Sequence, residues 1–152
     1  MRICMIGTGY VGLVSGACFA DLGNNVWCVD KNKDKIDMLN NGDIPIYEPG
    51  LKEIVSKNHI SKRLKFTTNV PLAVKESDLI FICVGTPTAK DGSANLSYVY
   101  SAAKEISYNI NKFKIIINKS TVPVCTGDIV EKIISKNVNR RNFEVISNPE
   151  FL

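Results

Sequence analysis

Residues 3–12 read ICMIGTGYVG, so that four apolar residues lead directly into three glycines at the spacing G-x-G-x-x-G. A helical pattern with an apolar face follows at once. A strand, a glycine turn and a helix in this order form the context in which the spacing binds the diphosphate of a dinucleotide. Gly7 then allows the tight turn, Gly9 lets the phosphates approach the backbone, and Gly12 lets the helix pack closely on the strand.

Apolar runs of strand length alternate with helical patterns along the whole chain. Strands are predicted at residues 3–6, 26–29, 64–67, 79–84, 114–117 and 143–146. Helices are predicted from Tyr10 to Gly23, from Asn32 to about Gly42, over 51–57 and 70–75, and after the caps Asn95 and Thr126. Apolar strands separated by helices indicate a parallel sheet covered on both faces. Right-handed crossovers make a doubly wound α/β sheet, a Rossmann-type dinucleotide-binding domain, the simplest topology.

The composition is that of one globular domain. The chain has 152 residues, of which 45% are hydrophobic and 22% charged, and this excludes a disordered chain or a disulfide-stapled miniprotein. The net charge is +4 and the lysines are scattered, so we expect neither a nucleic acid nor a membrane as partner. No apolar run approaches the roughly 18 residues of a membrane helix, and the glycine turn interrupts the first apolar run too early for a signal peptide. We therefore expect a cytoplasmic protein.

The cysteines and the single histidine do not predict a metal site. The five cysteines are widely spaced, form no CxxC pair and mostly lie in apolar runs, namely Cys4, Cys18, Cys28, Cys83 and Cys125. Buried, reduced thiols are the expectation for such a pattern. The one histidine, His59, cannot form a metal site or a catalytic triad alone, and we interpret it as a surface residue.

Asp30 ends the second predicted strand, 23 positions after Gly7, where the dinucleotide pattern requires an acid. Its carboxylate can accept hydrogen bonds from the adenosine ribose. Three lysines crowd the same turn and raise the alternative of NADP, namely Lys31, Lys33 and Lys35. Because Asp30 would repel a 2′-phosphate, we favour NAD, with Lys35 along the adenosine side of the pocket.

Polar clusters follow three of the later strands, at residues 84–88, 119–123 and 147–152. Each cluster alone is typical of an ordinary turn or a helix cap. In an open α/β sheet, however, ligands bind at the carboxyl ends of the strands. The three clusters together therefore predict a second part of the site at the same edge of the sheet.

These motifs, together with IPIYEPGL at residues 44–51, resemble the UDP-glucose 6-dehydrogenase family over the whole chain. The resemblance implies an NAD-dependent enzyme that oxidises the C6 alcohol of UDP-glucose twice, to UDP-glucuronate, with two NAD. The residues it implies for NAD binding are Gly7, Gly9, Tyr10, Val11, Gly12, Asp30, Lys35, Gly85, Thr86, Ser120 and Thr121. Thr121 is also implied as a catalytic residue beside the nicotinamide and the reacting water or hydroxyl. Glu150 is implied as a catalytic base or water-orienting group, and Glu150, Phe151 and Leu152 as contacts of the sugar nucleotide.

The sequence departs from the family pattern in two respects. Cys125 replaces the glycine expected after Val122-Pro123-Val124, which leaves the geometry of that turn open. The family's central helix and C-terminal domain, which carry the cysteine that forms a thiohemiacetal and then a thioester, have no counterpart here. We therefore expect residues 1–152 to be the NAD-binding domain alone and to be inactive by itself, with the full-length enzyme a homo-oligomer. The alternatives are a GDP-mannose or UDP-N-acetylmannosamine dehydrogenase, or a non-catalytic NAD-binding fragment of a split gene.

Overall fold

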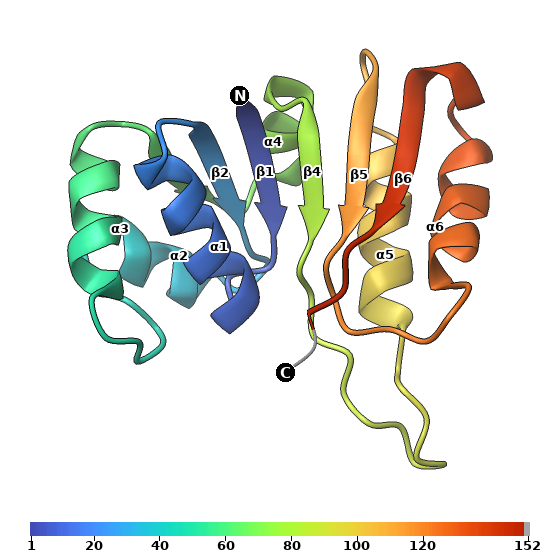
Figure 1. The fold of residues 1–152 in the computed structure, drawn as a ribbon, viewed down its shortest axis with the longest axis horizontal. Coiled ribbons are helices and arrows are strands. Elements are labelled where there is room, and N and C mark those ends of the chain that lie inside the picture. The colour runs from blue at the N-terminus through green and yellow to red at the C-terminus, as the bar shows by residue number, and fades with distance from the viewer. Residues whose placement is uncertain (151–152) are drawn as a thin grey trace.

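A single parallel sheet forms the centre of the computed structural model, which describes residues 1–150 (Figure 1). Within this range the strands are β1 (Arg2–Ile6), β2 (Asn25–Val29), β3 (Leu64–Thr67), β4 (Leu79–Ile82), β5 (Lys114–Asn118) and β6 (Phe143–Ser147). They lie in the order β3-β2-β1-β4-β5-β6, and each neighbouring pair is parallel. This order reverses direction between β1 and β4. The predicted doubly wound α/β fold is therefore confirmed.

Helices cover both faces of the sheet, as Figure 1 shows. They are α1 (Tyr10–Asp21), α2 (Lys33–Asn40), α3 (Leu51–Ile60), α4 (Val70–Glu76), α5 (Ser97–Ser107) and α6 (Thr126–Ser135), with a short 3₁₀ helix at Arg140–Asn142. Side chains of α1, α2 and α3 share one hydrophobic cluster with Ile3 and Met5 of β1. Side chains of α4, α5 and α6 share the other cluster with Cys4 and Ile6. Successive residues of β1 thus enter opposite cores, which explains why the strand is apolar throughout.

The first turn of α6 differs from the prediction. Thr126 is the first residue of α6 rather than its cap, and its hydroxyl donates a hydrogen bond to the Pro123 carbonyl at 2.7 Å. The cap residue is Cys125, whose φ of 68° and ψ of 1° lie in the left-handed region. The chain thus keeps the backbone conformation that a glycine adopts without strain, although a side chain is present.

Three of the five cysteines are buried as predicted, but the prediction is wrong for Cys18 and Cys125, which are exposed. Cys18 lies on the outer side of α1, and Cys125 lies in the turn before α6. All five thiols are free. His59 is half-buried rather than fully exposed: its ring lies 5.3 Å from that of Phe66, and its Nδ1 lies 3.1 Å from the Leu64 carbonyl oxygen.

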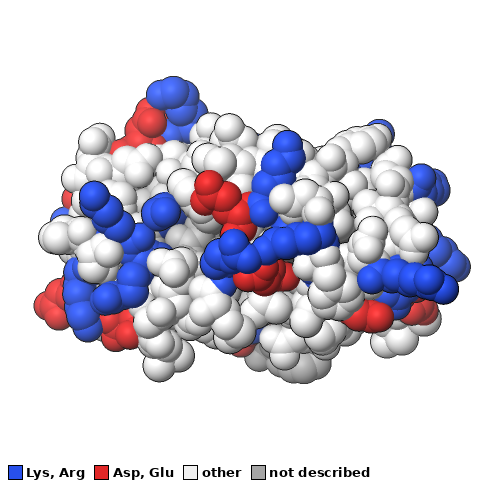
Figure 2. Space-filling model, turned by 90° about the horizontal axis from the view of Figure 1, so that it is seen from above, with Lys and Arg blue, Asp and Glu red and all other residues white. Residues whose placement is uncertain are grey.

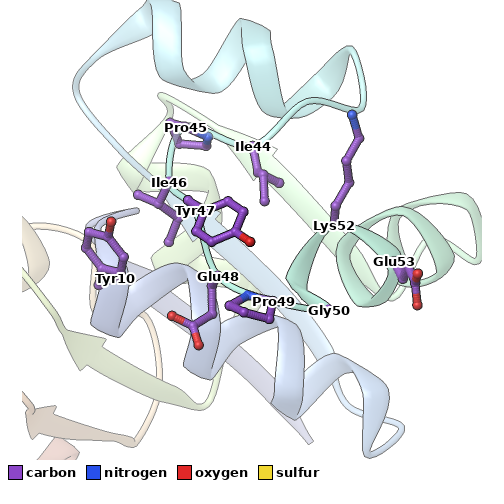
Figure 3. A pocket seen from close by; sticks show the side chains of 10 residues that line it. All are labelled: Tyr10, Ile44, Pro45, Ile46, Tyr47, Glu48, Pro49, Gly50, Lys52 and Glu53. Carbon is purple, nitrogen blue, oxygen red and sulfur yellow. The ribbon is translucent and has the colours of Figure 1, made fainter.

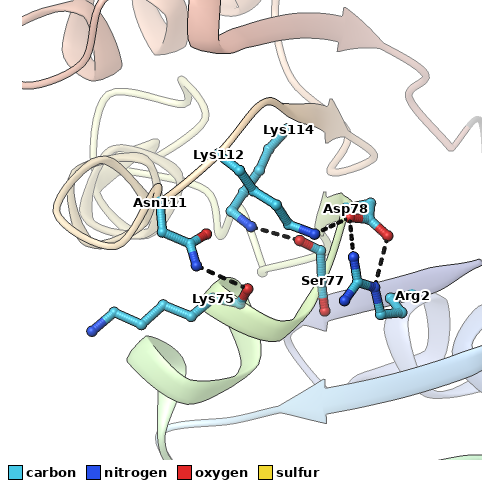
Figure 4. A network of polar contacts seen from close by, with 7 residues as sticks. All are labelled: Arg2, Lys75, Ser77, Asp78, Asn111, Lys112 and Lys114. Atoms are coloured by element: carbon cyan, nitrogen blue, oxygen red, sulfur yellow. Dashed lines mark hydrogen bonds and ion pairs between the residues drawn. The ribbon is translucent and has the colours of Figure 1, made fainter.

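The surface at which the strands begin carries both signs of charge, and blue and red groups lie next to each other near its centre (Figure 2). At the starts of β1, β4 and β5, the Arg2 guanidinium and the Lys112 ammonium both bind the Asp78 carboxylate (Figure 4). Asp78 has a pKa of about 2, because hydrogen bonds from Arg2 and Lys112 stabilise its ionised form. Within residues 1–150, no helix is long and apolar enough to cross a membrane.

Lys114, the first residue of β5, lies under this surface and is fully buried. Its ammonium donates a hydrogen bond to the Ser77 carbonyl at 2.6 Å (Figure 4). Burial, with the nearby Lys112, lowers the pKa of Lys114 from 10.5 to about 8, although Asp78 acts in the opposite direction. The folded chain therefore releases this proton at a lower pH than the unfolded chain does.

Replacing Lys114 by Met should remove a pH dependence of stability. Between about pH 8 and 10.5 the unfolded state holds the Lys114 proton and the folded state does not, so stability rises with pH in this window. Relative to Lys114→Met, the wild type should gain up to about 1.4 kcal/mol of unfolding free energy per pH unit there. Urea unfolding at pH 7, 8, 9 and 10 measures the difference. A difference in unfolding free energy between the two proteins that stays constant from pH 7 to 10 would contradict the lowered pKa of Lys114.

Replacing Cys125 by Gly should stabilise the domain. A left-handed residue with a Cβ costs about 1–2 kcal/mol, and part of this gain is offset by the greater freedom of glycine in the unfolded chain. We expect a net gain of roughly 0.5–1 kcal/mol in thermal or urea unfolding. Cys18→Gly is the matched control: it changes the other exposed cysteine, inside α1, and should destabilise by about the same amount. A loss of stability in both variants would rule out strain at Cys125.

Candidate functional site

A cavity of about 530 Å³ opens at the carboxyl ends of β1, β2 and β4, beside the point where the strand order reverses. This is the position at which open α/β sheets bind their ligands. The lining comes from the glycine turn, from the ends of the three strands and from one side of α5, and includes Gly7, Thr8, Gly9, Asp30, Lys31, Lys35, Cys83, Gly85, Ser101 and Glu105.

Close packing explains two of the three glycines of the turn. Gly7 has a φ of +108°, and a Cβ there would lie 2.4 Å from the Cys83 carbonyl oxygen. A Cβ on Gly12 would lie only 1.9 Å from the Gly7 carbonyl oxygen. At Gly9, in contrast, a Cβ would meet no atom of residues 1–150 within 4 Å, apart from those of its chain neighbours. The space over Gly9 is therefore open on a residue that lines the cavity, as the approach of a ligand to the backbone requires.

The N-terminus of α1 adjoins this open space. Its cap residue is Gly9, which offers no side chain to accept hydrogen bonds from the first amides, and the first turn contains no acidic residue. The first amides of α1 and the helix dipole therefore favour a negatively charged group at this end. A dinucleotide diphosphate has the charge and the acceptors that fit this arrangement.

Asp30 follows β2 and lies against the glycine turn. Its Oδ2 accepts hydrogen bonds from the Thr8 amide at 3.0 Å and the Thr8 hydroxyl at 2.7 Å, and its Oδ1 accepts one from the Asn32 amide at 3.0 Å. Partial burial raises the pKa of Asp30, but the hydrogen bonds from Asn32 and Thr8 together outweigh it, so the pKa lies below the usual range. Asp30 is therefore ionised at neutral pH and retains acceptor capacity on Oδ1.

Two of the three neighbouring lysines line the cavity with Asp30. The Lys35 ammonium lies 3.8 Å from Asp30 Oδ2. Lys31 extends across to α5, where its ammonium donates a hydrogen bond to the Ser101 hydroxyl and lies 3.5 Å from the Glu105 carboxylate. Lys33 is bound to Asp37 on α2 and is not among the residues that line the cavity.

The predicted meeting of polar groups at the ends of β4, β5 and β6 is present. The Thr86 hydroxyl donates to the Thr121 carbonyl at 2.9 Å, and the Thr121 hydroxyl donates to the Glu150 carbonyl at 2.7 Å. The Glu150 carboxylate forms an ion pair with Lys119, whose side chain is only 15% exposed. Three segments far apart in the sequence are thus joined at one edge of the sheet.

Other predicted site residues are placed differently. The Ser120 side chain is buried, and its hydroxyl donates to the Val84 carbonyl at 2.7 Å, so that it joins β5 to β4. Tyr10 lines a second cavity, of about 640 Å³, with the loop 44–50, and Figure 3 shows its side chain beside Ile46. Val11 is partly buried and packs against the core. Phe151 and Leu152 lie outside the described residues.

Sequence reasoning missed three side chains at the site. Thr8 occupies the position between the first two glycines, which the glycine pattern does not specify. Its polar side chain was the only feature in the sequence that could have indicated a role. Lys119 was noted at a strand end but not paired with Glu150, and Glu105 was not singled out on its helix.

Cys83 lines the cavity, and burial raises the pKa of its thiol to about 12, so this cysteine stays protonated.

Known proteins resemble this chain over its whole length. The sequence model described as "UDP-glucose/GDP-mannose dehydrogenase family, NAD binding domain" matches residues 1–152. The chain is 55% identical to UDP-glucose 6-dehydrogenase TuaD of Bacillus subtilis over 99% of its own length and 33% of that protein. It is 56% identical to UDP-glucose 6-dehydrogenase of Rhizobium meliloti, over 100% of the chain and 35% of that protein. The chain thus spans about a third of the length of these curated relatives.

A solved structure shows the same arrangement. The ternary complex of GDP-mannose dehydrogenase from Pseudomonas aeruginosa superposes with a TM-score of 0.95 at 38% identity, over 100% of this chain and 36% of that one. The reversed strand order, the glycine turn before α1 and the acid after β2 are thus features of a chain that matches a family of NAD-binding domains. On the match over all 152 residues, this chain belongs to the UDP-glucose/GDP-mannose dehydrogenase family, as its NAD-binding domain.

Proposed function

We propose that this domain is the NAD-binding part of a UDP-glucose 6-dehydrogenase, which oxidises UDP-glucose at C6 to UDP-glucuronate with two NAD. The observation that carries the proposal is the joint geometry of the glycine turn and Asp30, on a chain 55% identical to a UDP-glucose 6-dehydrogenase. NAD supplies the hydride acceptor for the oxidation. The domain's own residues bind it, orient it and hold the groups that act on the sugar.

In this proposal the adenosine half of NAD occupies the cavity between the glycine turn and α5. The first amides of α1 bind the diphosphate at Gly9, where the space is open. Asp30 accepts hydrogen bonds from the ribose, and Lys35 lies on the same side. Gly12 contributes by allowing α1 to pack closely on β1, rather than by contact with NAD.

The nicotinamide half then extends toward the ends of β4, β5 and β6, where Gly85, Thr86 and Thr121 follow their strands. Thr121 lies beside Glu150, and its hydroxyl oxygen can still accept a hydrogen bond from a water or from the substrate hydroxyl. Glu150, paired with Lys119, is the proposed base that activates or orients the water for thioester hydrolysis. In the full-length enzyme, Glu150 also lies near the sugar nucleotide.

The choice among nucleotide sugars depends on sequence similarity. GDP-mannose and UDP-N-acetylmannosamine dehydrogenases have the same domain, with TM-scores of 0.95 and 0.90 at 38% and 32% identity. The higher identity to named UDP-glucose enzymes, 55% and 56%, favours UDP-glucose. We also propose a cytoplasmic location, because the charged substrates NAD and UDP-glucose do not cross a lipid bilayer unaided.

The domain should bind NAD about ten to a hundred times more tightly than NADP. NADP lacks the 2′-hydroxyl that donates to Asp30, and its 2′-phosphate is repelled by the Asp30 carboxylate. Together these effects cost roughly 1.5–3 kcal/mol of binding free energy. Calorimetry on the wild type, on Asp30→Asn and on Asp34→Asn measures this preference. Asp34, in the first turn of α2, is the matched control and should leave the ratio unchanged. Equal affinities for NAD and NADP in the wild type would exclude the role of Asp30.

Glu150→Gln in the full-length enzyme should slow the hydrolysis of the thioester. Glutamine keeps the size and the hydrogen-bonding capacity of the side chain but cannot accept a proton, so the covalent enzyme–sugar adduct should accumulate. Intact-protein mass spectrometry after mixing with UDP-glucose and NAD detects the adduct. Glu144→Gln is the control, since Glu144 lies nearby on β6 but is exposed and bound to Arg140. Normal turnover without an adduct would leave Glu150 as a structural partner of Lys119.

A further inference from the structure

Thr8 is fully buried in the glycine turn, although it carries a polar side chain. Its hydroxyl and its amide both donate to the same oxygen, Oδ2 of Asp30, at 2.7 and 3.0 Å. A dinucleotide turn needs glycine on either side of this position but places no such demand on the position itself. The hydroxyl of Thr8 is therefore a feature of this chain that the backbone of the turn does not explain.

The contacts divide the two oxygens of Asp30 between two tasks. Oδ2 is directed inward, where it accepts two hydrogen bonds from Thr8 and faces Lys35 at 3.8 Å. Among the described residues 1–150, Oδ1 accepts a hydrogen bond from the Asn32 amide alone, so it retains a free acceptor site toward them. With Oδ2 fixed by Thr8, rotation of the carboxylate is restricted, and Oδ1 is the oxygen left for a ligand.

We propose that Thr8 is a positioning residue for the dinucleotide: its buried hydroxyl orients the Asp30 carboxylate so that Oδ1 is available to the adenosine ribose. The proposal rests on the proposed function, because it concerns the same NAD site. Thr8 acts through Asp30 and does not itself bind the ribose. Its two hydrogen bonds to Asp30 link the turn that binds the diphosphate to the acid that binds the ribose.

This arrangement also has a consequence for the effect of pH. The hydrogen bond from the Thr8 hydroxyl lowers the pKa of Asp30, together with the amides of Asn32 and Thr8 and with the charge of Lys35. Of the other nearby charges, Lys31 is held toward Glu105 of α5. Loss of the Thr8 hydroxyl therefore raises the pKa of Asp30. Since the ionised carboxylate is the better ribose acceptor, NAD binding should then begin to weaken at a higher pH as the solution is acidified.

The test compares two variants that lack the hydroxyl with one that keeps it. Thr8→Val preserves the branched shape and Thr8→Ala avoids crowding, so an effect common to both reports the missing hydroxyl, while Thr8→Ser restores it. Ser107→Ala is the matched control, because it removes a buried hydroxyl of α5 that is not among the residues lining the cavity. Calorimetry with NAD from pH 5 to 8, and carbon NMR titration of the Asp30 carboxyl without NAD, are the measurements. Circular dichroism at each pH selects the conditions in which every variant is folded.

We expect Val and Ala at position 8 to weaken NAD binding about threefold to tenfold at pH 7, which matches the net contribution of one ordinary hydrogen bond. Both should raise the Asp30 titration midpoint, and Thr8→Ser and Ser107→Ala should resemble the wild type in both measurements. Wild-type behaviour of Thr8→Val and Thr8→Ala, or failure of Thr8→Ser to restore binding, would overturn the role of Thr8 alone. Absence of NAD binding by the wild-type chain would instead overturn the proposed function, and the role of Thr8 with it.

Discussion

The depth at which α1 packs on the sheet is the constraint on which the rest of the site depends. A Cβ on Gly12 would lie 1.9 Å from the Gly7 carbonyl oxygen, and one on Gly16 would lie 2.6 Å from the Cys28 sulfur. The helix can therefore lie this close to β1 and β2 only if both positions are glycine. The turn before α1 also lies within hydrogen-bond distance of the residue that follows β2, because Ile6 pairs with Val29 and the Gly7 amide donates to the Val29 carbonyl. The contact between Thr8 and Asp30 is a direct result of this pairing.

Strand positions could be predicted because both faces of the sheet are buried. An apolar run in such a sheet has few alternatives, and β3 agrees with its predicted range residue for residue. β4 ends two residues earlier than predicted, at Ile82, although Cys83 and Val84 are also apolar. The reason is its neighbour: Ile82 pairs with Ile6, where β1 ends and the glycine turn begins. Apolar sequence marks a strand, but the length of the neighbouring strand decides where pairing stops.

Helix caps and buried charges were harder to predict. A cap depends on the backbone conformation just before the helix, and a buried charge depends on which residues from elsewhere in the chain cover it. Asn32 caps α2 as predicted, and its side chain accepts a hydrogen bond from the Lys35 amide. Thr126 has an equally suitable side chain, but the left-handed Cys125 before it directs the hydroxyl back to Pro123. Lys114 was correctly assigned to the start of a strand. Nothing in the sequence near it indicated that the strand begins beneath Ser77 and Asp78, which cover the side chain.

Within the site, the sequence identified the strand ends but not the direction of each side chain. Ser120 and Thr121 are adjacent hydroxyl residues after β5, yet the first donates to the segment after β4 and the second to the segment after β6. The chain bends at Ser120, so the direction of each side chain depends on how this bend packs against the segment after β4, which the sequence alone does not indicate. The contacts of Thr121 and Lys119 with Glu150 hold the end of β6 against β5, whereas Thr8 holds Asp30 against the turn. The two halves of the crevice are thus stabilised by separate hydrogen-bond systems on either side of β4. A substitution at Thr8 or Asp30 can therefore alter the binding of the adenosine while Thr121, Lys119 and Glu150 stay in place.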